Sequence, residues 1–331
     1  MGDDDMSGER RAVVTGVAGL VGTAVGRALA RDGWTVRGLV RRPWDDAPKW
    51  LGEQWVGDLT SPRTLRGLCA DTDLVVHSGA MVSDWAPLDA FWQVNRDGTG
   101  SLLDEAQRRS VGRFVWVGTA NVFGFRTDTV VHERVVKRCP PFPYPQSKLD
   151  TERVVWDYAR RGLAVTVVYP SWVFGPGDRH LVPELVARLR AGQFVHIGGG
   201  RAPLELTYSE NLAEAIILAG TRDEGRGEGF LVGDGYGLTL GGFVEAVASA
   251  AGVAPPRFSI PTRAAYSLAA ASELVARVTR SESRPMLTRY AVRSLATGVR
   301  YDLGKIRALG YRPRIGLDEA VRRAVAAAPA T

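Results

Sequence analysis

The chain has 331 residues, of which 45% are hydrophobic and 24% are charged, and its formal net charge is +6. This composition suits a folded globular protein with one large core, or with a core and a smaller lobe. No apolar run approaches the ~20 residues that cross a bilayer, which excludes a transmembrane helix.

Charge and cysteine usage exclude further classes. The arginines are spread along the chain, so the positive charge indicates a solvated surface and no nucleic-acid partner. Cys69 and Cys139 lie far apart and the four histidines lack metal-ligand spacing, which predicts reduced thiols and no metal site. The polar N-terminus lacks the apolar stretch of a secretory signal, so we expect a disordered tail over residues 1–10 and a cytoplasmic protein.

Strand-like and helix-like segments alternate along the first half of the chain. The predicted strands are residues 12–15, 35–40, 54–56, 74–77, 113–117 and 164–169; the predicted helices are residues 20–31, a short one from Ser61, one within 87–109, and 144–161. This alternation predicts right-handed βαβ units and a parallel sheet. The apolar strands predict a sheet that is covered on both faces.

The second half has a looser pattern of short elements and glycine turns. We assign residues 11–173 to a large domain, to which residues 203–222 return, and residues 174–202 and 223–331 mainly to a smaller lobe. Residues 266–278 form an alanine-rich apolar helix. Its short length and flanking arginines favour a packing helix over one that touches a membrane or gates a substrate.

A glycine-rich turn links the first strand to the first helix. Gly16, Gly19 and Gly22 would let the backbone approach a pyrophosphate, next to the free N–H groups of a helix start. Tight packing alone also requires glycine, but the strand–turn–helix context favours dinucleotide binding. The second strand ends in Arg41 and Arg42, with no carboxylate before Asp45, which favours NADP(H) over NAD(H) unless the arginines are plain surface charges.

Tyr144 and Lys148 lie one helical turn apart, on one face of a predicted helix. The chain has only four lysines among 42 basic residues. A lysine at this position therefore suggests chemistry that needs a compact ammonium rather than a planar guanidinium.

A series of ordered motifs resembles the extended short-chain dehydrogenases/reductases, in the 3β-hydroxysteroid dehydrogenase-like branch of the epimerase/dehydratase superfamily. The motifs are residues 15–22, 57–59, 77–80, 94–99, 117–124, 144–148 and 170–178, and residues 82–85 and 285–289 resemble that branch. The resemblance implies an α/β fold, with a Rossmann-type doubly wound parallel sheet and a smaller C-terminal substrate-binding lobe.

The resemblance also implies which residues act. Tyr144 would be the general acid/base, Lys148 would lower its pKa and bind ribose hydroxyls, and Thr119 would hydrogen-bond the substrate oxygen. The implied cofactor-binding residues are Gly16, Ala18, Gly19, Leu20, Val21, Gly22, Arg41, Arg42, Asp58, Leu59, Ser78, Gly79, Ala80, Asn95, Tyr144, Lys148, Pro170, Ser171, Trp172 and Val173. Asp58 is also compatible with a loop cap, and Asn95 with a helix anchor.

Departures from other branches narrow the reaction. Thr119 is followed by Ala120 and Asn121 where nucleotide-sugar dehydratases carry an Asp-Glu pair, and Leu204 stands where epimerases carry a diphosphate-binding arginine, although Arg201 is close. Mostly apolar residues occupy the expected pocket: Ser83, Trp85, Asn121, Phe123, Trp172, Phe174 and Tyr208, with Met81 and Phe125. Such walls fit a hydrophobic substrate, although core packing is the alternative for the aromatic residues.

We therefore predict an NADP(H)-dependent oxidoreductase that interconverts a ketone and a secondary alcohol on a steroid-like or polyketide-like substrate. The alternatives are a nucleotide-sugar epimerase or reductase, and a non-catalytic NADP-binding sensor. The sequence leaves open the exact substrate, the direction of the reaction and the oligomeric state, for which a homodimer is one option.

Overall fold

The computed structural model describes residues 9–125, 128–279, 284–285 and 287–329. Its centre is a seven-stranded parallel sheet with the order β12-β7-β5-β4-β1-β2-β3. The strands are β1 (Arg11–Thr15), β2 (Thr35–Val40), β3 (Glu53–Val56), β4 (Leu74–His77), β5 (Arg113–Val117), β7 (Val165–Pro170) and β12 (Glu228–Val232). This architecture confirms the predicted α/β fold class.

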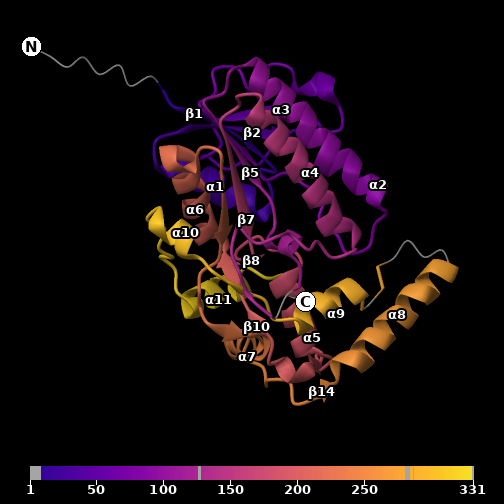
Figure 1. The fold of residues 1–331 in the computed structure, drawn as a ribbon. Coiled ribbons are helices and arrows are strands. Elements are labelled where there is room, and N and C mark those ends of the chain that lie inside the picture. Colours follow the sequence, from indigo (N-terminus) through magenta and orange to yellow (C-terminus); the bar gives the residue numbers. More distant parts are fainter. Residues whose placement is uncertain (1–8, 126–127, 280–283, 286, 330–331) are drawn as a thin grey trace, which may run out of the picture.

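Helices cover both faces of the sheet (Figure 1). On one face α1 (Leu20–Arg31) packs against α6 (Ser209–Thr221), and on the other α3 (Gly98–Arg108) packs against α4 (Pro143–Arg160). The central strands are fully buried, as expected for a sheet with two covered faces. The chain order reverses beside β1, which lies between β2 and β4, so the loops after β1 and β4 border the crevice where such folds bind ligands.

The helix predicted within residues 87–109 is divided into three parts. It consists of α2 (Leu88–Phe91), a π-helical segment η2 (Trp92–Asp97) and α3. Asn95 lies in the π-helical segment and is buried. Segments of this kind are frequent at functional sites because they redirect side chains. The periodicity of the sequence does not distinguish such a segment from ordinary α-helix.

The smaller lobe has its own core of buried side chains from the helices α5 (Leu181–Arg190), α7 (Leu240–Ala250) and α11 (Leu317–Ala326). Short strand pairs complete it: β8 (Trp172–Phe174) with β11 (Leu206–Tyr208), β9 (His196–Ile197) with β14 (Ser259–Ile260), and β10 (Pro203–Leu204) with β13 (Leu238–Thr239). The short helices η1 (Pro62–Leu65), η4 (Gly198–Gly200) and η5 (Asp223–Gly225) lie in connections.

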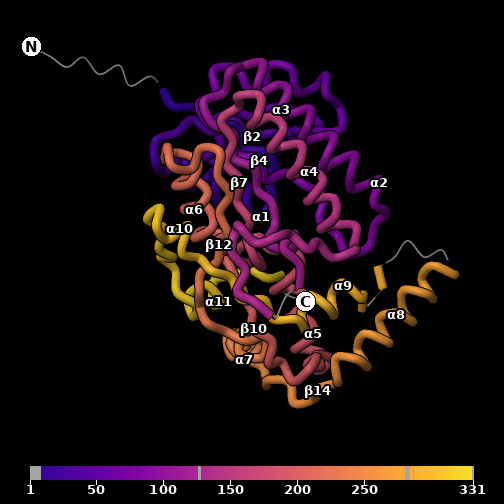
Figure 2. The backbone as a smooth tube through the Cα atoms, in the orientation of Figure 1, coloured from indigo at the N-terminus to yellow at the C-terminus, as the bar shows by residue number. Residues whose placement is uncertain are grey.

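Two segments that the sequence places in the smaller lobe belong to the large domain. β12 extends the main sheet by pairing with β7, and Val299, Leu303, Ile306 and Tyr311 are part of the large core. The strand pair β6 (Val130–Val131) and β15 (Arg300–Tyr301), and the helix α10 (Gly304–Ala308), bring the C-terminal segment back along the sheet (Figure 2). Short edge elements carry too little periodicity to show which core they join.

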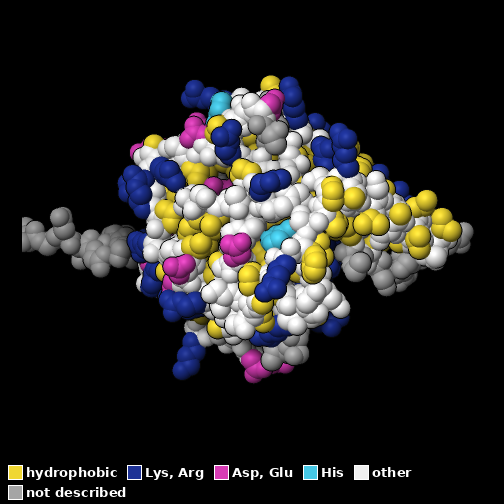
Figure 3. Space-filling model, turned by 90° about the horizontal axis from the view of Figure 1, so that it is seen from below, with side chains coloured by type: hydrophobic (Ala, Val, Ile, Leu, Met, Phe, Trp, Pro, Cys, Tyr) yellow, Lys and Arg dark blue, Asp and Glu magenta, His cyan; other side chains and the backbone are white. Residues whose placement is uncertain are grey.

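The apolar helix predicted over residues 266–278 is α8 (Thr262–Val278), which packs against α9 (Arg289–Ala296). Ala265, Ala269 and Ala276 are buried, whereas the opposite face exposes Leu268, Leu274, Val275 and Val278. Figure 3 shows this helix projecting from the body with hydrophobic side chains on its surface. In the part of the chain that the structure describes, no helix is both long and apolar enough to cross a membrane.

Candidate functional site

The glycine turn between β1 and α1 has a backbone that other residues could not adopt. Gly16 has φ of +66°, and a Cβ there would come within 2.9 Å of the Gly79 backbone. A Cβ at Gly22 would lie 2.1 Å from the Gly16 carbonyl oxygen. Gly19 begins α1 without any side-chain cap, which leaves the helix start open to an anion. The turn therefore fits a dinucleotide pyrophosphate.

A buried chain of hydrogen bonds locks the ends of β1 and β4 together. The Gly79 N–H donates to Thr15 Oγ1 (3.0 Å), and that hydroxyl is 2.6 Å from His77 Nδ1. His77 Nε2 is 2.8 Å from Thr99 Oγ1, and the Thr99 hydroxyl donates to the Asn95 carbonyl. Burial lowers the pKa of His77 to about 3, so its ring is neutral. Each group in the chain then donates to the next, from the Gly79 N–H to the Asn95 carbonyl, and His77 carries its proton on Nε2.

Asn95 fixes the loop that follows β4. Its side-chain oxygen accepts the Met81 N–H at 2.7 Å, while its amide donates to the Met81 carbonyl (3.1 Å) and to Ser147 Oγ (3.1 Å). All three contacts are to protein. Asn95 therefore positions the loop and α4, and its predicted contact with a cofactor stays a prediction.

The end of β2 exposes two arginines beside the glycine turn. Within the described residues neither Arg41 nor Arg42 forms a hydrogen bond or an ion pair, so both are available to an anion. Asp58 accepts hydrogen bonds from the Thr60 N–H and hydroxyl, at 2.8 and 2.7 Å. These bonds lower the pKa of Asp58 and keep it ionised, with Arg41 adding to the effect. Hydrogen bonds within its own loop thus hold the Asp58 carboxylate in place.

The remaining predicted cofactor residues border the same crevice at the carboxyl ends of the strands. Ala18, Leu20 and Val21 lie at the start of α1, Leu59 follows β3, Ser78, Gly79 and Ala80 follow β4, and Pro170, Ser171, Trp172 and Val173 end β7 or follow it. Two of the hydroxyls are already used by protein. Ser78 Oγ donates to the Thr15 carbonyl at 2.8 Å, and Ser171 Oγ is 3.0 Å from Thr207 Oγ1.

Lys148 is buried on α4, and its Nζ donates to the Val117 carbonyl at 2.8 Å. The ammonium also lies 4.8 Å from the centre of the Trp116 ring. Burial lowers the pKa of Lys148 to about 7. The amine can therefore both hold and release a proton near neutral pH.

Tyr144 lies one turn before Lys148, at the start of α4. Burial raises the pKa of Tyr144 to about 12, and a side-chain hydrogen bond to Thr119 works against that rise. Thr119 comes two residues after the end of β5 and caps the short helix η3 (Ala120–Phe123) by accepting the Asn121 N–H at 3.3 Å. In this structure the Lys148 ammonium donates to Val117, and the lowering of the Tyr144 pKa by Lys148 stays a prediction.

A small cavity lies beside Tyr144. The described residues that line it are Ser83, Asp84, Phe91, Phe142, Pro143, Tyr144 and Tyr290. Of the predicted substrate residues, Ser83 is in this wall. Trp85 is half-buried, 6.0 Å from the Arg277 guanidinium of α8, and Asn121 reaches the cavity through its hydrogen bond to Tyr290.

Three predicted substrate residues, Phe123, Phe174 and Tyr208, are fully buried in hydrophobic cores instead. Phe123 is fully buried with its ring centre 5.2 Å from that of Tyr169, and Phe174 is fully buried between Tyr208 and Phe243. These side chains offer no surface to a substrate in this structure, and Trp172 packs against the core of the smaller lobe. Core packing, the alternative for the aromatic residues, describes their positions better.

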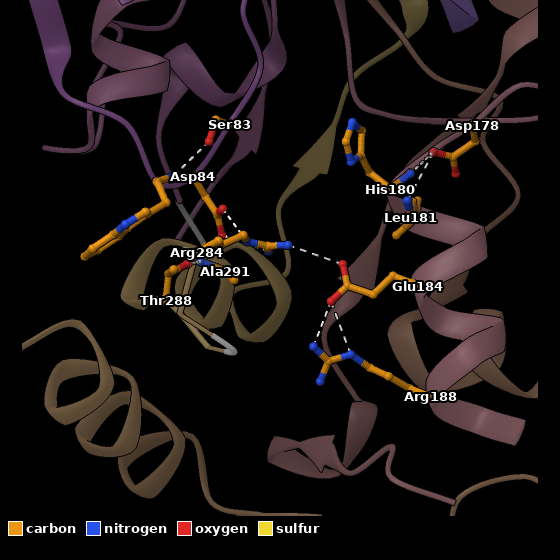
Figure 4. Close-up of polar contacts among 11 residues, drawn as sticks. Ser83, Asp84, Asp178, His180, Leu181, Glu184, Arg188, Arg284, Thr288 and Ala291 are labelled. Atoms are coloured by element: carbon orange, nitrogen blue, oxygen red, sulfur yellow. Dashed lines mark hydrogen bonds and ion pairs between the residues drawn. The ribbon is translucent and has the colours of Figure 1, made fainter. Parts of the chain in front are cut away.

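The sequence reasoning missed Asp84, Phe142 and Tyr290. The Thr288 hydroxyl, which caps α9, donates to Asp84 at 2.8 Å, and Arg284 forms an ion pair with the same carboxylate at 2.5 Å. Figure 4 shows Arg284 between Asp84 and Glu184, its second carboxylate partner. These contacts dock α9 against the large-domain loop and bring Tyr290 to the cavity. The motif at residues 285–289 was the available signal, because it ends one residue before Tyr290.

The start of helix α5, which carries Glu184, is held by hydrogen bonds to one carboxylate. Asp178 accepts the N–H groups of His180, Leu181 and Val182 at 2.8 to 3.1 Å, and so caps the helix (Figure 4). Glu184 also pairs with Arg188 one turn later, at 2.7 Å. The carboxylate that reaches across to Arg284 is thus held by a rigid helix.

Comparison with known proteins agrees with this geometry. Residues 12–233 match the NAD dependent epimerase/dehydratase family. The chain is 28% identical to a 2-alkyl-3-oxoalkanoate reductase of Stenotrophomonas maltophilia, over 96% of this chain and 99% of that protein. It is 31% identical to the 4-hydroxy-2-methyl-3-oxo-4-farnesyl-3,4-dihydroquinoline-1-oxide ketoreductase of Stigmatella aurantiaca, over 95% and 96% of the two chains.

A sterol relative and a solved structure extend the comparison. The sterol-4-alpha-carboxylate 3-dehydrogenase of Schizosaccharomyces pombe is 27% identical, over 82% of this chain and 83% of that protein. The crystal structure of gox2253 superposes with a TM-score of 0.80 at 27% identity, covering 96% and 98% of the two chains. The chain therefore belongs to the NAD dependent epimerase/dehydratase family, as an extended short-chain dehydrogenase/reductase of the 3β-hydroxysteroid dehydrogenase-like branch, and is an oxidoreductase.

Proposed function

We propose that this oxidoreductase uses NADP(H) to interconvert a ketone and a secondary alcohol on a hydrophobic substrate, with Tyr144 as the general acid/base. The observation that carries the proposal is the placement of the Tyr144 phenol, whose pKa is influenced by the nearby Thr119 side chain and which borders a cavity whose wall includes Phe91, Phe142 and Pro143. The names of the relatives, which act on 3-oxo compounds and on a sterol 3-position, support the same reaction class.

The residues around the crevice fit the cofactor. The glycine turn has no room for a Cβ where a pyrophosphate would pass, and Arg41 and Arg42 are exposed and form no hydrogen bond or ion pair within the described part of the chain. Gly16, Gly19 and Gly22 would hold the pyrophosphate, Arg41 and Arg42 the 2′-phosphate, and Lys148 the ribose next to the nicotinamide. When bound, the nicotinamide would supply or accept the hydride.

The chain's own residues would handle the proton. The Tyr144 phenol is protonated at neutral pH, so in the reductive direction it donates a proton to the oxygen of the ketone as that oxygen gains charge. Thr119 holds the phenol, and its hydroxyl can support the developing alkoxide. Lys148, with its pKa near neutral, can replace the proton that Tyr144 gives up. Oxidation of the alcohol follows the same steps in reverse.

The test is NADPH oxidation by the purified full chain against a substrate panel. The panel holds 2-alkyl-3-oxo compounds, steroid ketones and UDP-sugars, and NADPH binding is followed separately by its fluorescence. We expect turnover with the hydrophobic ketones and none with the sugars. Binding of NADPH without turnover of any ketone would instead identify a sensor, and interconversion of UDP-sugars would identify an epimerase.

A further inference from the structure

The second phenol of the cavity, Tyr290, has an unused proton. Its oxygen accepts a hydrogen bond from the Asn121 side-chain amide at 2.8 Å. Because that lone pair is occupied by a donor, the hydroxyl hydrogen of Tyr290 must point elsewhere. Among the described residues Tyr290 Oη makes no hydrogen bond besides the one from Asn121, and a half-buried phenol whose proton has no acceptor is costly.

The position of Tyr290 is set by contacts on several sides. Its ring packs edge-on against Phe142, with 5.2 Å between ring centres, and lies 6.1 Å from Phe125. The helix that carries it is docked through Thr288 and Arg284 to Asp84. Burial and the nearby Tyr144 raise the pKa of Tyr290 above its usual range, so the hydroxyl keeps its proton. The site is a fixed donor rather than a mobile surface tyrosine.

Tyr144 and Tyr290 line the same cavity and supply two phenolic donors to it. The reacting oxygen of a ketone has two lone pairs, which the proposed mechanism gives to Tyr144 and to the Thr119 hydroxyl, so a simple ketone leaves Tyr290 without an acceptor. The described wall holds one charged side chain, the Asp84 carboxylate, which Arg284 and Thr288 already bind, and it holds no cation for a substrate anion. The chemistry of the wall thus suits a second oxygen that accepts a hydrogen bond and carries no charge.

We propose that Tyr290 determines specificity by donating a hydrogen bond to a second, uncharged oxygen of the substrate, such as the carbonyl of an ester or amide beside the reacting ketone. Asn121 is the positioning residue that turns the Tyr290 proton toward the cavity. This inference rests on the proposed ketone–alcohol chemistry and names the substrate class of the same site.

The test compares three matched probes with NADPH: a hydrophobic 3-oxo ester, the corresponding free 3-oxo acid, and the plain ketone in which methylene groups replace the ester. With the wild type we expect kcat/KM for the ester to exceed that for the plain ketone by roughly tenfold or more, the size of one buried hydrogen bond, and to exceed that for the acid. Tyr290→Phe should lower the ester to the level of the plain ketone and change the plain ketone by less than about twofold.

Two further variants separate this role from packing. Asn121→Asp keeps the size of the side chain but supplies an acceptor for the Tyr290 proton, and should abolish the preference for the ester while the ring stays in place. Tyr158→Phe removes a phenol that donates to Asp104 near the far end of α4, outside the described wall of the cavity, and should leave all three rates unchanged. Equal losses on the ester and the plain ketone in Tyr290→Phe, or a wild type that prefers the acid, would overturn the inference. Turnover of the plain ketone by the wild type would still support the proposed function.

Discussion

The two sides of the Tyr144 site are built in different ways. On the cofactor side, the residues come from short contiguous motifs at the ends of strands, and backbone geometry does most of the shaping. On the substrate side, the cavity wall combines Asp84, Phe142 and Tyr290, which are distant in the sequence. The first kind of site follows from local steric rules, whereas the second depends on how a separate helix docks.

The difference also appears in how polar groups are held. On the cofactor side, Thr15, His77 and Thr99 form a closed chain in which every donor has a protein acceptor. On the substrate side, the Tyr290 proton has no acceptor among the described residues. A rigid, satisfied network suits a cofactor that is always the same, and an unsatisfied donor suits a substrate that must be selected.

Apart from removal of the Tyr144 acid itself, the largest effect on turnover should come from Thr119, the residue that joins the two sides. Thr119→Val keeps the shape of the side chain but removes the hydroxyl that bonds Tyr144 and caps η3. We expect a loss of about tenfold to a hundredfold in kcat/KM, the range for one buried hydrogen bond. Thr119→Ser retains the hydroxyl and is the control, measured on the same ketone. Equal rates for the two variants would reduce Thr119 to a packing residue.

Much of the fold was readable from the sequence, because each prediction depended on one short segment. The bounds of α1, β2, β4 and β5 are those expected from periodicity, glycine and the apolar runs. The edge strand β12 was missed because five residues with one buried end do not reveal their partner. The residues that the motifs assign to the cofactor lie around one crevice, and their role there stays a prediction.

The substrate wall was predicted poorly for a related reason. An aromatic residue near a motif has the same sequence signal whether it faces a cavity or a core, and Phe123, Phe174 and Tyr208 face cores. Tyr290 lies more than a hundred residues from Tyr144, so only the docking of α9 reveals that they are neighbours. The protonation states were also beyond the sequence, since burial sets the pKa values of Tyr144 and Lys148.

The proposed binding of the cofactor 2′-phosphate can be tested by removing the positive charge at the end of β2. Replacing both Arg41 and Arg42 by Ala should weaken NADPH binding by roughly tenfold to a hundredfold, the value of a charge-assisted contact, and leave NADH binding nearly unchanged. The measurement is the Kd of each cofactor for the wild type and the double variant. A wild type that binds both cofactors equally would mark the arginines as surface charges and the enzyme as NAD-dependent.

A further prediction concerns the stability of the fold rather than turnover or cofactor affinity. The pKa of Lys148 is about 7 in the folded protein and ordinarily 10.5, so the unfolded chain binds the extra proton more tightly. Stability should therefore rise with pH between these two values. Lys148→Met should remove the penalty of a buried ammonium, which is about 1.4 kcal/mol for each pH unit that separates the folded pKa from the unfolded pKa.

The matching measurement is the free energy of unfolding of the apo protein against pH. We expect Lys148→Met to exceed the wild type most below the folded pKa of about 7, and the gap to close as the pH rises toward the unfolded value of 10.5. Addition of NADPH should stabilise the wild type more than the variant, since Lys148 is proposed to hold the ribose. A gap that does not change with pH would mean that the amine is not desolvated as the structure indicates.

The central claim is that Tyr144 transfers the proton, and Tyr144→Phe tests it most directly. The measurement is single-turnover reduction of a hydrophobic ketone by the variant at saturating NADPH, with the Kd for NADPH measured in parallel. The account predicts a rate lower by ~10²–10⁴-fold with an almost unchanged Kd, because the phenylalanine keeps the ring and loses only the acid. A variant that reduces the ketone at close to the wild-type rate would contradict the assignment.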